Sequence, residues 1–411
     1  MTLIKNFPIP SDRMAIISTL LYIKDAVVLE YGPEGTTHFS MNFYNQLGQK
    51  YVNRLFTTGI DDNDIVMGDV TRLEEAILEI DALYKPKVIF VITSSVISII
   101  GTDVTGICDN IQNKVQAKLI SINCSGLSAD FSAGLTKIYL TLAEEFLQPA
   151  TPKKKNKYNI LGVSLLNFRA ESDVWELQNL LSEAFDYEML HCLALDINTH
   201  DISELGSAEI NIVLSAEGVP CAEYIKKVTG VPYVYFIPYG YADTTEFLKR
   251  IEELIQKPVA ETLKNRLSEK QRQQQLFFNS PILAKVGKKI FIKGNYDIAI
   301  GLQKYFQSNN LPVEFCLCNH SLSRVMNKEK ITHLKNEQEY LDILKHLHGY
   351  LVLSDEITLS QCGTDNFKLC ISHPTISFKN IATHLPFIGE KGADMLFEQL
   401  QQYLSLRLSD G

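Results

Sequence analysis

The chain has 411 residues, a hydrophobic content of 45%, a charged content of 21% and a formal net charge of −9. This length predicts two or three domains with ample core. The acidic balance argues against a nucleic-acid partner, because binding to phosphates requires a basic surface. The N-terminal residues lack a signal-peptide pattern. The longest apolar stretch, residues 88–100, is interrupted by hydroxyl side chains and is shorter than the ~18 residues of a membrane span. We therefore expect a cytoplasmic protein with no membrane partner.

The first predicted domain, residues 1–150, contains the clearest helix–strand–turn pattern of the chain. Apolar residues recur at helical spacing over residues 70–83, which predicts an amphipathic helix. Pro86 ends that helix, and the continuous apolar run over residues 88–92 predicts a strand that is covered on both faces. A hydroxyl-rich turn at residues 93–95 follows this strand. In an open α/β sheet, ligands bind at such a carboxyl end.

Strand–helix alternation continues in two further segments, residues 158–257 and residues 287–375. We interpret the lysine-rich residues 149–157 as a solvated loop before the second domain. A long polar helix over residues 258–286 is expected to connect the second domain to the third. Alternating strands and helices favour parallel sheets. The C-terminal tail, residues 376–411, is expected to pack on the first domain.

Several short motifs give the chain a family resemblance. In chain order they are Tyr31-Gly32-Pro33-Glu34-Gly35, Phe56-Thr57-Thr58, Asp64-Ile65-Val66-Met67-Gly68, Leu73-Glu74-Glu75-Ala76-Ile77, Ile100-Gly101-Thr102-Asp103 and Asn123-Cys124-Ser125-Gly126-Leu127. In order and spacing they resemble component 1 of the nitrogenase family, which includes the dark-operative protochlorophyllide reductase and cofactor-assembly scaffolds. The resemblance implies an α/β fold of three Rossmann-like domains, with mostly parallel sheets around a central cleft.

The resemblance also implies two metal sites, and at both of them this chain lacks the ligands of the family. The family holds an iron–sulfur cluster with cysteine thiolates near the subunit interface, and the matching positions here are Thr36 and Ser95. Such clusters require soft thiolates, for which neutral hydroxyls are poor substitutes. At the cysteine and histidine positions of the active-site cofactor, the chain has Ser215 and Lys379. We therefore expect no cluster bound by this chain alone and no dinitrogen-reducing activity.

The cleft implied by the resemblance retains polar groups. Glu34 and His38 are the candidate acid–base residues, because a histidine at a strand-end turn can titrate near neutrality. A helix-capping or interface role for His38 is an equally good alternative. The other expected cleft residues are Gly32, Gly35, Thr36, Thr37, Ser94, Ser95, Ser215, Lys379 and His384.

Two further patterns bear on ligand binding. Cys316 and Cys318 end a predicted strand and are candidate metal ligands, with core packing as the alternative. Gly294-Asn295-Tyr296-Asp297 also follows a strand, but it lacks the glycine spacing of known phosphate-binding loops. We interpret that segment as a plain turn.

Three functional hypotheses remain open from the sequence, and the third is a homo-oligomer that uses Cys316 and Cys318 to bind a metal. In the first, the chain is an oxidoreductase subunit that forms a homo- or hetero-oligomer with another component 1-like subunit. That partner would supply the iron–sulfur ligands for a shared cluster, and an ATP-dependent iron–sulfur reductase would deliver electrons. In the second, the chain is a redox-inactive scaffold that binds a metallocofactor precursor or another small ligand.

Overall fold

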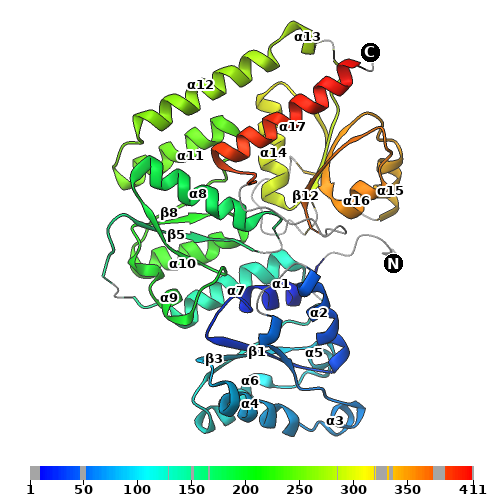
Figure 1. Cartoon of the computed structure of the whole chain (residues 1–411). Coiled ribbons are helices and arrows are strands. Elements are labelled where there is room, and N and C mark those ends of the chain that lie inside the picture. The colour runs from blue at the N-terminus through cyan, green and yellow to red at the C-terminus, as the bar shows by residue number, and fades with distance from the viewer. Residues whose placement is uncertain are drawn as a thin grey trace.

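The structure is a computed structural model, shown in Figure 1. It describes residues 10–46, 52–127, 129–149, 152–164, 167–284, 286–318, 320, 331–332, 337–373 and 385–409. Three parallel sheets of four strands each form the framework. This arrangement confirms the prediction of an α/β fold with three Rossmann-like domains.

The three sheets repeat one topology, in which the strand that comes first in the chain lies second in its sheet. The first sheet has the order β2-β1-β3-β4 and contains β1 (Ala26–Tyr31), β2 (Leu55–Thr57), β3 (Val88–Thr93) and β4 (Lys118–Ile122). The second has the order β6-β5-β7-β8 and contains β5 (Lys157–Leu161), β6 (Glu188–Cys192), β7 (Ile210–Val213) and β8 (Tyr233–Tyr235). The third has the order β10-β9-β11-β12 and contains β9 (Ile290–Gly294), β10 (Val313–Cys318), β11 (Leu351–Asp355) and β12 (Phe367–Ser372).

Helices cover the faces of these sheets. Around the first sheet lie α1 (Asp12–Leu20), α2 (Glu34–Gln46), α3 (Asp62–Met67), α4 (Thr71–Tyr84), α5 (Ser95–Ile100), α6 (Val104–Ile111) and α7 (Phe131–Phe146). The second part of the chain contains α8 (Ala170–Phe185), α9 (Thr199–Ser203), α10 (Val219–Thr229) and α11 (Gly240–Ile255). The third contains α12 (Glu261–Phe278), α13 (Pro281–Ala284), α14 (Tyr296–Ser308), α15 (Glu337–Lys345), α16 (Glu356–Gln361) and α17 (Gly389–Ser409).

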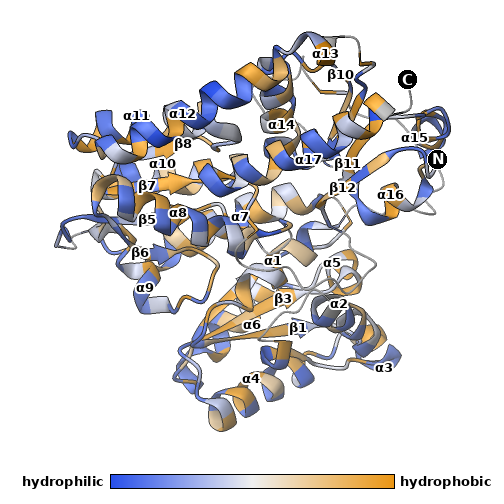
Figure 2. Ribbon diagram, turned by 45° about the horizontal axis from the view of Figure 1, so that its top comes forward, coloured by the Kyte–Doolittle hydropathy of each residue, from blue (hydrophilic) through white to orange (hydrophobic). Residues whose placement is uncertain are grey.

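The central strands are apolar because both of their faces are covered. Every residue of β1 and of β3 is buried, and both strands are coloured as hydrophobic in Figure 2. The helices present one apolar face inward; in α4, for example, Leu73, Ile77 and Ile80 are buried. Strands that are buried on both faces and helices that are buried on one face are what the sequence predicted for parallel sheets.

Helix starts are set by short polar side chains. The Oδ1 of Asp69 accepts a hydrogen bond from the backbone N–H of Thr71 at 2.8 Å, which satisfies one of the free donors at the start of α4. Val70 occupies the N-cap position of α4, and its side chain makes no capping hydrogen bond. Ser94 is the N-cap of α5 and accepts from the N–H of Ile97 at 3.3 Å.

The C-terminal helix α17 packs against α11 and α8, not against the first sheet's helices as expected for the tail. Its buried residues Leu396, Leu400 and Tyr403 belong to the core that is shared by the second and third sheets. Lys270 of α12 forms ion pairs of 2.8 Å with Glu390 and Asp394 of α17. An amphipathic helix buries its apolar face wherever a complementary face is available, and here the core shared by the second and third sheets provides it.

Within the described residues, none of the helices combines the length and the low polarity that crossing a bilayer requires.

Candidate functional site

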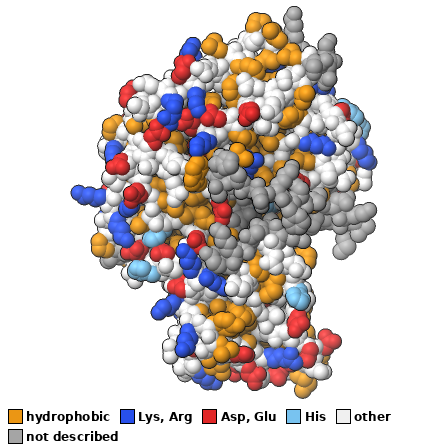
Figure 3. All heavy atoms as spheres, viewed as in Figure 1, with side chains coloured by type: hydrophobic (Ala, Val, Ile, Leu, Met, Phe, Trp, Pro, Cys, Tyr) orange, Lys and Arg blue, Asp and Glu red, His pale blue; other side chains and the backbone are white. Residues whose placement is uncertain are grey.

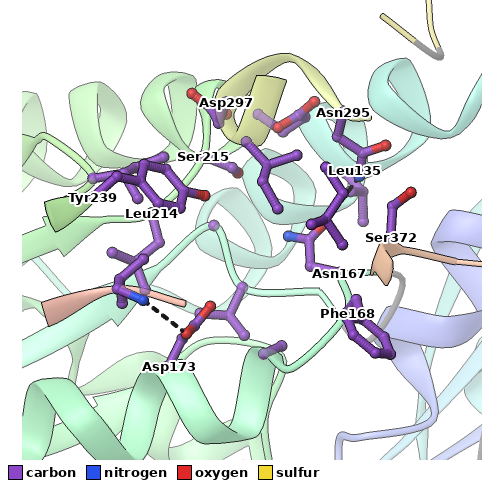
Figure 4. A pocket seen from close by; sticks show the side chains of 18 of the residues that line it. Leu135, Asn167, Phe168, Asp173, Leu214, Ser215, Tyr239, Asn295, Asp297 and Ser372 are labelled. Carbon is purple, nitrogen blue, oxygen red and sulfur yellow. Dashed lines mark hydrogen bonds between the residues drawn. The ribbon is translucent and has the colours of Figure 1, made fainter. Parts of the chain in front are cut away.

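A cavity of about 70 Å³ lies where the second and third sheets meet α7 (Figure 4). Its walls come from the turns after β5, β7, β8 and β9, from the end of β12 and from α7. Carboxyl ends of parallel strands therefore converge on it, which is the usual ligand position in open α/β sheets. Its polar lining residues are Asn167, Asp173, Ser215, Glu217, Tyr239, Asn295, Asp297 and Ser372.

Ser215 lies at the cavity wall because two turns pack closely there. Gly162, directly after β5, has φ +77°, a conformation that glycine adopts without strain. A Cβ at Gly162 would lie 2.7 Å from Ser215 Oγ, so a larger residue would collide with the serine. Ser215 is 4% exposed, and its Oγ has no hydrogen-bond partner among the described residues. The sequence placed Ser215 in the cleft, and the structure brings it to the cavity.

Two carboxyl groups beside Ser215, those of Asp297 and Glu217, make hydrogen bonds that connect the three parts of the chain. Asp297, in the first turn of α14, accepts hydrogen bonds from the Ala216 N–H at 2.8 Å and from the Tyr235 hydroxyl. Glu217 accepts from the Ser132 hydroxyl of α7 at 2.6 Å. Burial, followed by the nearby Glu217 charge, raises the pKa of Asp297 to about 7. Near neutral pH this carboxyl can therefore hold or release a proton.

A third carboxyl lines the cavity from the first turn of α8. One oxygen of Asp173 accepts from the N–H groups of Phe387 at 2.7 Å and of Ile388 at 3.4 Å. Figure 4 draws the second of these two hydrogen bonds. Asp173 thereby fixes the chain that enters α17. Burial raises the pKa of Asp173 to about 7, although the two backbone hydrogen bonds oppose the shift.

The end of β12 contributes a hydroxyl and, next to it, an imidazole. Ser372 is 4% exposed, and its Oγ lacks a hydrogen-bond partner in the described part of the chain. Burial lowers the pKa of His373 to about 4, so its ring is neutral at pH 7. That ring meets the edge of Phe168, with ring centroids 5.6 Å apart. The cavity is thus bordered by hydroxyls and carboxyls, and the neutral imidazole of His373 follows its Ser372 wall in the chain without lining it.

Thr36, at the position expected for the first iron–sulfur ligand, belongs to a hydrogen-bond network around Glu30. Thr36 donates its hydroxyl to Glu30 at 2.9 Å, and Thr37 donates to the other Glu30 oxygen at 3.0 Å. Glu30, on β1, is fully buried and forms an ion pair with Arg13 of α1. The hydroxyl that stands at the ligand position therefore helps to hold a buried salt bridge.

The second expected ligand position is also engaged in the protein's own hydrogen bonds. Ser95 donates to the backbone carbonyl of Ser125 at 2.6 Å. A Cβ on Gly126 would lie 3.4 Å from Ser11 Oγ and 3.6 Å from Ser95 Oγ, so both hydroxyls border this glycine. Sequence reasoning had not singled out Ser11. Hydroxyls that lie here without thiolates do not fit an iron–sulfur cluster held by this chain alone.

The remaining predicted residues are distributed between helix termini and the surface. Glu34 and His38 are exposed on α2, and neither lines the cavity. A Cβ on Gly32 would lie 2.4 Å from Ser94 Cβ, so the turn after β1 packs tightly on the start of α5. Gly35 has open space around its Cα. Two further predicted residues, Lys379 and His384, lie outside the described residues.

The two cysteines proposed as metal ligands lie in the core. Cys316 and Cys318 are 6% and 4% exposed. The Cys316 thiol donates weakly to the Ala299 carbonyl at 3.6 Å, and burial raises its pKa to about 12. A metal ligand must be a thiolate, which such an environment disfavours. The described residues contain no group of three or more His, Cys, Asp or Glu side chains arranged to hold a metal ion.

Several residues of these sites were not recognised from the sequence, among them Glu30, Arg13, Asp173, Glu217 and Ser372. Glu30 carried a signal, because a carboxylate within the apolar run of β1 requires a buried partner. Arg13 and Glu217 carried none, because their partners lie 17 and 85 positions away. The segment from Gly294 to Asp297 was interpreted as a plain turn, yet Asn295 and Asp297 line the cavity.

Comparison with known proteins assigns the fold and the family. The family model for the nitrogenase component 1 type oxidoreductase matches residues 14–404. The solved structure "Nitrogenase Cp1 at pH 6.5" superposes with a TM-score of 0.80 over 99% of this chain and 94% of that chain, at 15% sequence identity.

Curated relatives share sequence with about three-fifths of the chain. The nitrogenase iron-molybdenum cofactor biosynthesis protein NifE of Clostridium pasteurianum is 27% identical over 236 residues, which cover 57% of this chain and 51% of the relative. A subunit of the light-independent protochlorophyllide reductase of Prochlorococcus marinus (strain MIT 9215) is 26% identical over 269 residues, covering 62% of this chain and 50% of the relative. The chain thus spans about half the length of the curated relatives it matches. Because the family model covers nearly all of its residues, the chain belongs to the nitrogenase component 1 type oxidoreductase family.

Proposed function

We propose that the chain is a subunit of a nitrogenase-like component 1 oxidoreductase that provides a ligand cavity and a subunit interface but no cluster ligands. The supporting observation is that Thr36 and Ser95 are committed to hydrogen bonds within the chain, while the cavity at Ser215 keeps buried polar groups. A partner subunit of the same family supplies the thiolates of an iron–sulfur cluster. An ATP-dependent iron–sulfur reductase delivers the electrons. The chain itself is not a dinitrogen-reducing subunit.

Exposed apolar side chains on the first unit support a subunit interface there. The large apolar residues Ile99 and Ile100 of α5 are 74% and 46% exposed, Phe39 of α2 is 65% exposed, and Leu127 follows the Ser125 turn at 63%. The helices α2 and α5 lie side by side in both ribbon views (Figures 1 and 2). Hydrophobic side chains are also visible on this lower part of the molecule in Figure 3. Exposed apolar side chains that gather on neighbouring elements are typical of an interaction surface.

The names of the relatives point to shared assemblies and to metallocofactor chemistry. One relative acts in iron-molybdenum cofactor biosynthesis, and another is a subunit of a light-independent protochlorophyllide reductase. The second name supports a role as one subunit of a reductase. The first supports the alternative, in which the chain is a redox-inactive scaffold for a metallocofactor or another small ligand. Cys316 is a poor candidate ligand for either role, because its thiol is buried and donates to the Ala299 carbonyl.

Anaerobic co-purification with a cysteine-bearing component 1-like chain from the same source tests the proposal. We expect a stable complex that contains iron and acid-labile sulfide, whereas the chain alone contains neither. Iron-free protein in both forms would support the scaffold instead. An iron–sulfur cluster held by this chain's own residues would contradict the proposed function.

A pair of matched variants tests the interface. Ile99→Asp introduces a charge into the proposed interface and should abolish co-purification, because a buried unpaired charge opposes association. Leu254→Asp makes the same kind of change at the exposed end of α11, where the side chain is 45% exposed, and should leave the complex intact. If both variants co-purify with the partner chain equally well, the interface does not include α5.

A further inference from the structure

All charged side chains in the described lining of the cavity are carboxylic acids. Asp173, Glu217 and Asp297 are acidic, and the lining residues that the structure describes include no lysine, arginine or histidine. We propose that the cavity binds a small organic cation, an ammonium or alkylammonium group, and not an anionic metallocluster. This inference rests on the proposed function in taking the cavity as the ligand site of the subunit.

The basic groups closest along the chain are occupied elsewhere. The guanidinium of Arg169 donates to the Leu385 carbonyl at 2.9 Å and stacks on the Phe387 ring, 4.6 Å from its centre. His373 stays neutral at pH 7. An anion placed among the three carboxyls would therefore meet like charges, and Arg169, the cation that interacts with Asp173, is already bound to the Leu385 carbonyl. Such a placement is unfavourable in a buried site.

Two buried hydroxyls indicate that a hydrogen-bonding ligand completes the site. Ser215 and Ser372 are each 4% exposed, both line the cavity, and both Oγ atoms lack partners among the described residues. A buried hydroxyl without a partner is unfavourable, because it has lost its hydrogen bonds to water. In Figure 4, Ser215 lies beside Asp297, and Ser372 lies across the cavity near Phe168. An ammonium group has several N–H donors and can donate to a serine and a carboxylate at the same time.

Size and wall chemistry restrict the ligand further. A cavity of 150 Å³ is known to accommodate benzene, and this one is about 70 Å³. The ligand therefore has about four heavy atoms or fewer, by comparison with that case. The aromatic rings of Phe131, Phe168 and Tyr239 contribute to the walls. Such rings attract cations that lie over their faces.

The ionisation of the carboxyls should respond to the ligand. Asp297 is faced by Glu217 of η4 (Ala216–Gly218), Tyr235 of β8 and Tyr239 and Tyr296 near α11 and α14. A bound cation favours the carboxylate form, so binding should release protons below about pH 7. The affinity for a cation should accordingly rise with pH through this range.

The groups that face Asp173 are Arg169 and Glu176 of the same helix region, with Tyr239 opposite. Arg169, the cation among them, interacts with Asp173 but its guanidinium also donates to the Leu385 carbonyl, so Asp173 is expected to contribute to cation binding in the same direction as Asp297.

Isothermal titration calorimetry on the purified full chain tests this inference with three small probes. We expect methylammonium to bind with proton release, measured in two buffers of different ionisation enthalpy, and with an affinity that rises with pH. Acetamide, a neutral probe, and molybdate, an anion, should bind at least about tenfold more weakly, because neither gains from the carboxylates. Stronger binding of acetamide or molybdate, or no binding of any probe, would overturn the inference.

Variants connect the binding to the cavity. Asp297→Asn should weaken methylammonium binding about tenfold and reduce proton release, since an amide removes the charge. Asp342→Asn, on the exposed surface of α15, should change neither quantity. If Asp297→Asn does not fold, Ser215→Ala should still weaken binding several-fold by removing one acceptor; wild-type affinity in that variant would overturn the inference. If the two-chain complex contains iron but the chain does not bind methylammonium, this inference alone is rejected. If the chain binds methylammonium but the complex contains no iron, only the proposed function is rejected.

Discussion

Replacing Arg13 by methionine should strongly destabilise the protein, because it leaves a carboxylate buried without its counter-charge. Glu30 is 0% exposed and is held by Arg13, Thr36 and Thr37. The two threonine hydroxyls remain in the variant, but they carry no charge. Removing one partner of a buried ion pair costs about 3–5 kcal/mol. We therefore expect Arg13→Met to lower the free energy of unfolding by about that amount.

Urea titrations followed by far-ultraviolet circular dichroism measure this loss. The matched control is Arg250→Met, which breaks the ion pair of Arg250 with Glu246, whose side chains are 46% and 42% exposed. An exposed pair contributes about 0–1 kcal/mol, so the control should change little. The double variant Arg13→Met with Glu30→Met should recover most of the loss, because apolar side chains can replace a buried pair. If Arg13→Met were as stable as the control, the buried pair would not hold α1 to β1 as inferred here.

Three further changes test other parts of the structure. Gly134→Ala should destabilise the protein by about 1–3 kcal/mol, because its Cβ would lie 2.4 Å from a backbone oxygen of α1; the control Gly35→Ala has open space and should be neutral or slightly stabilising in thermal melts. Lys293→Met leaves the buried Asp355 unpaired, since the two form an ion pair at 2.8 Å, and should cost about 3–5 kcal/mol in urea titrations. Asp297 has a pKa of about 7, so only the folded state binds its proton between about pH 4 and pH 7. Wild-type stability should therefore gain a contribution towards acid pH that is lost as the pH rises through this range, and urea titrations of Asp297→Asn should lack that contribution.

The fold was predictable because its signals are local. Strand β3 was expected over residues 88–92 and is observed over Val88–Thr93, since a continuous apolar run between a proline and a hydroxyl turn has few other structures available. The position of α17 was not predictable in the same way. Its apolar face shows that it must pack, but the choice of α8 and α11 depends on residues more than a hundred positions away.

The candidate site was predictable only where one strand end determines the position of a residue. Ser215 was expected in the cleft and lines the cavity, because it follows β7 directly. Asp297 looks in the sequence like an ordinary acidic residue in the first turn of a helix. Its environment comes from Glu217 and Tyr235, which reach it only when the second and third sheets are assembled. Local patterns carry no information about such a distant pair.

The two sites that the family resemblance implied differ in what this chain puts there, and the difference limits the chemistry available to it. Beside Thr36 an internal ion pair occupies the polar groups, so the region is suited to stability and to contact with a partner. Beside Ser215 the polar groups remain open to a cavity, and Asp173 and Asp297 both have pKa values of about 7. Groups that exchange protons near neutrality suit general acid–base work, whereas neither site offers the thiolates that hold an iron–sulfur cluster. Under the proposed function, electrons would arrive through a partner, and the chain's own cavity would contribute the placement of a ligand and of protons.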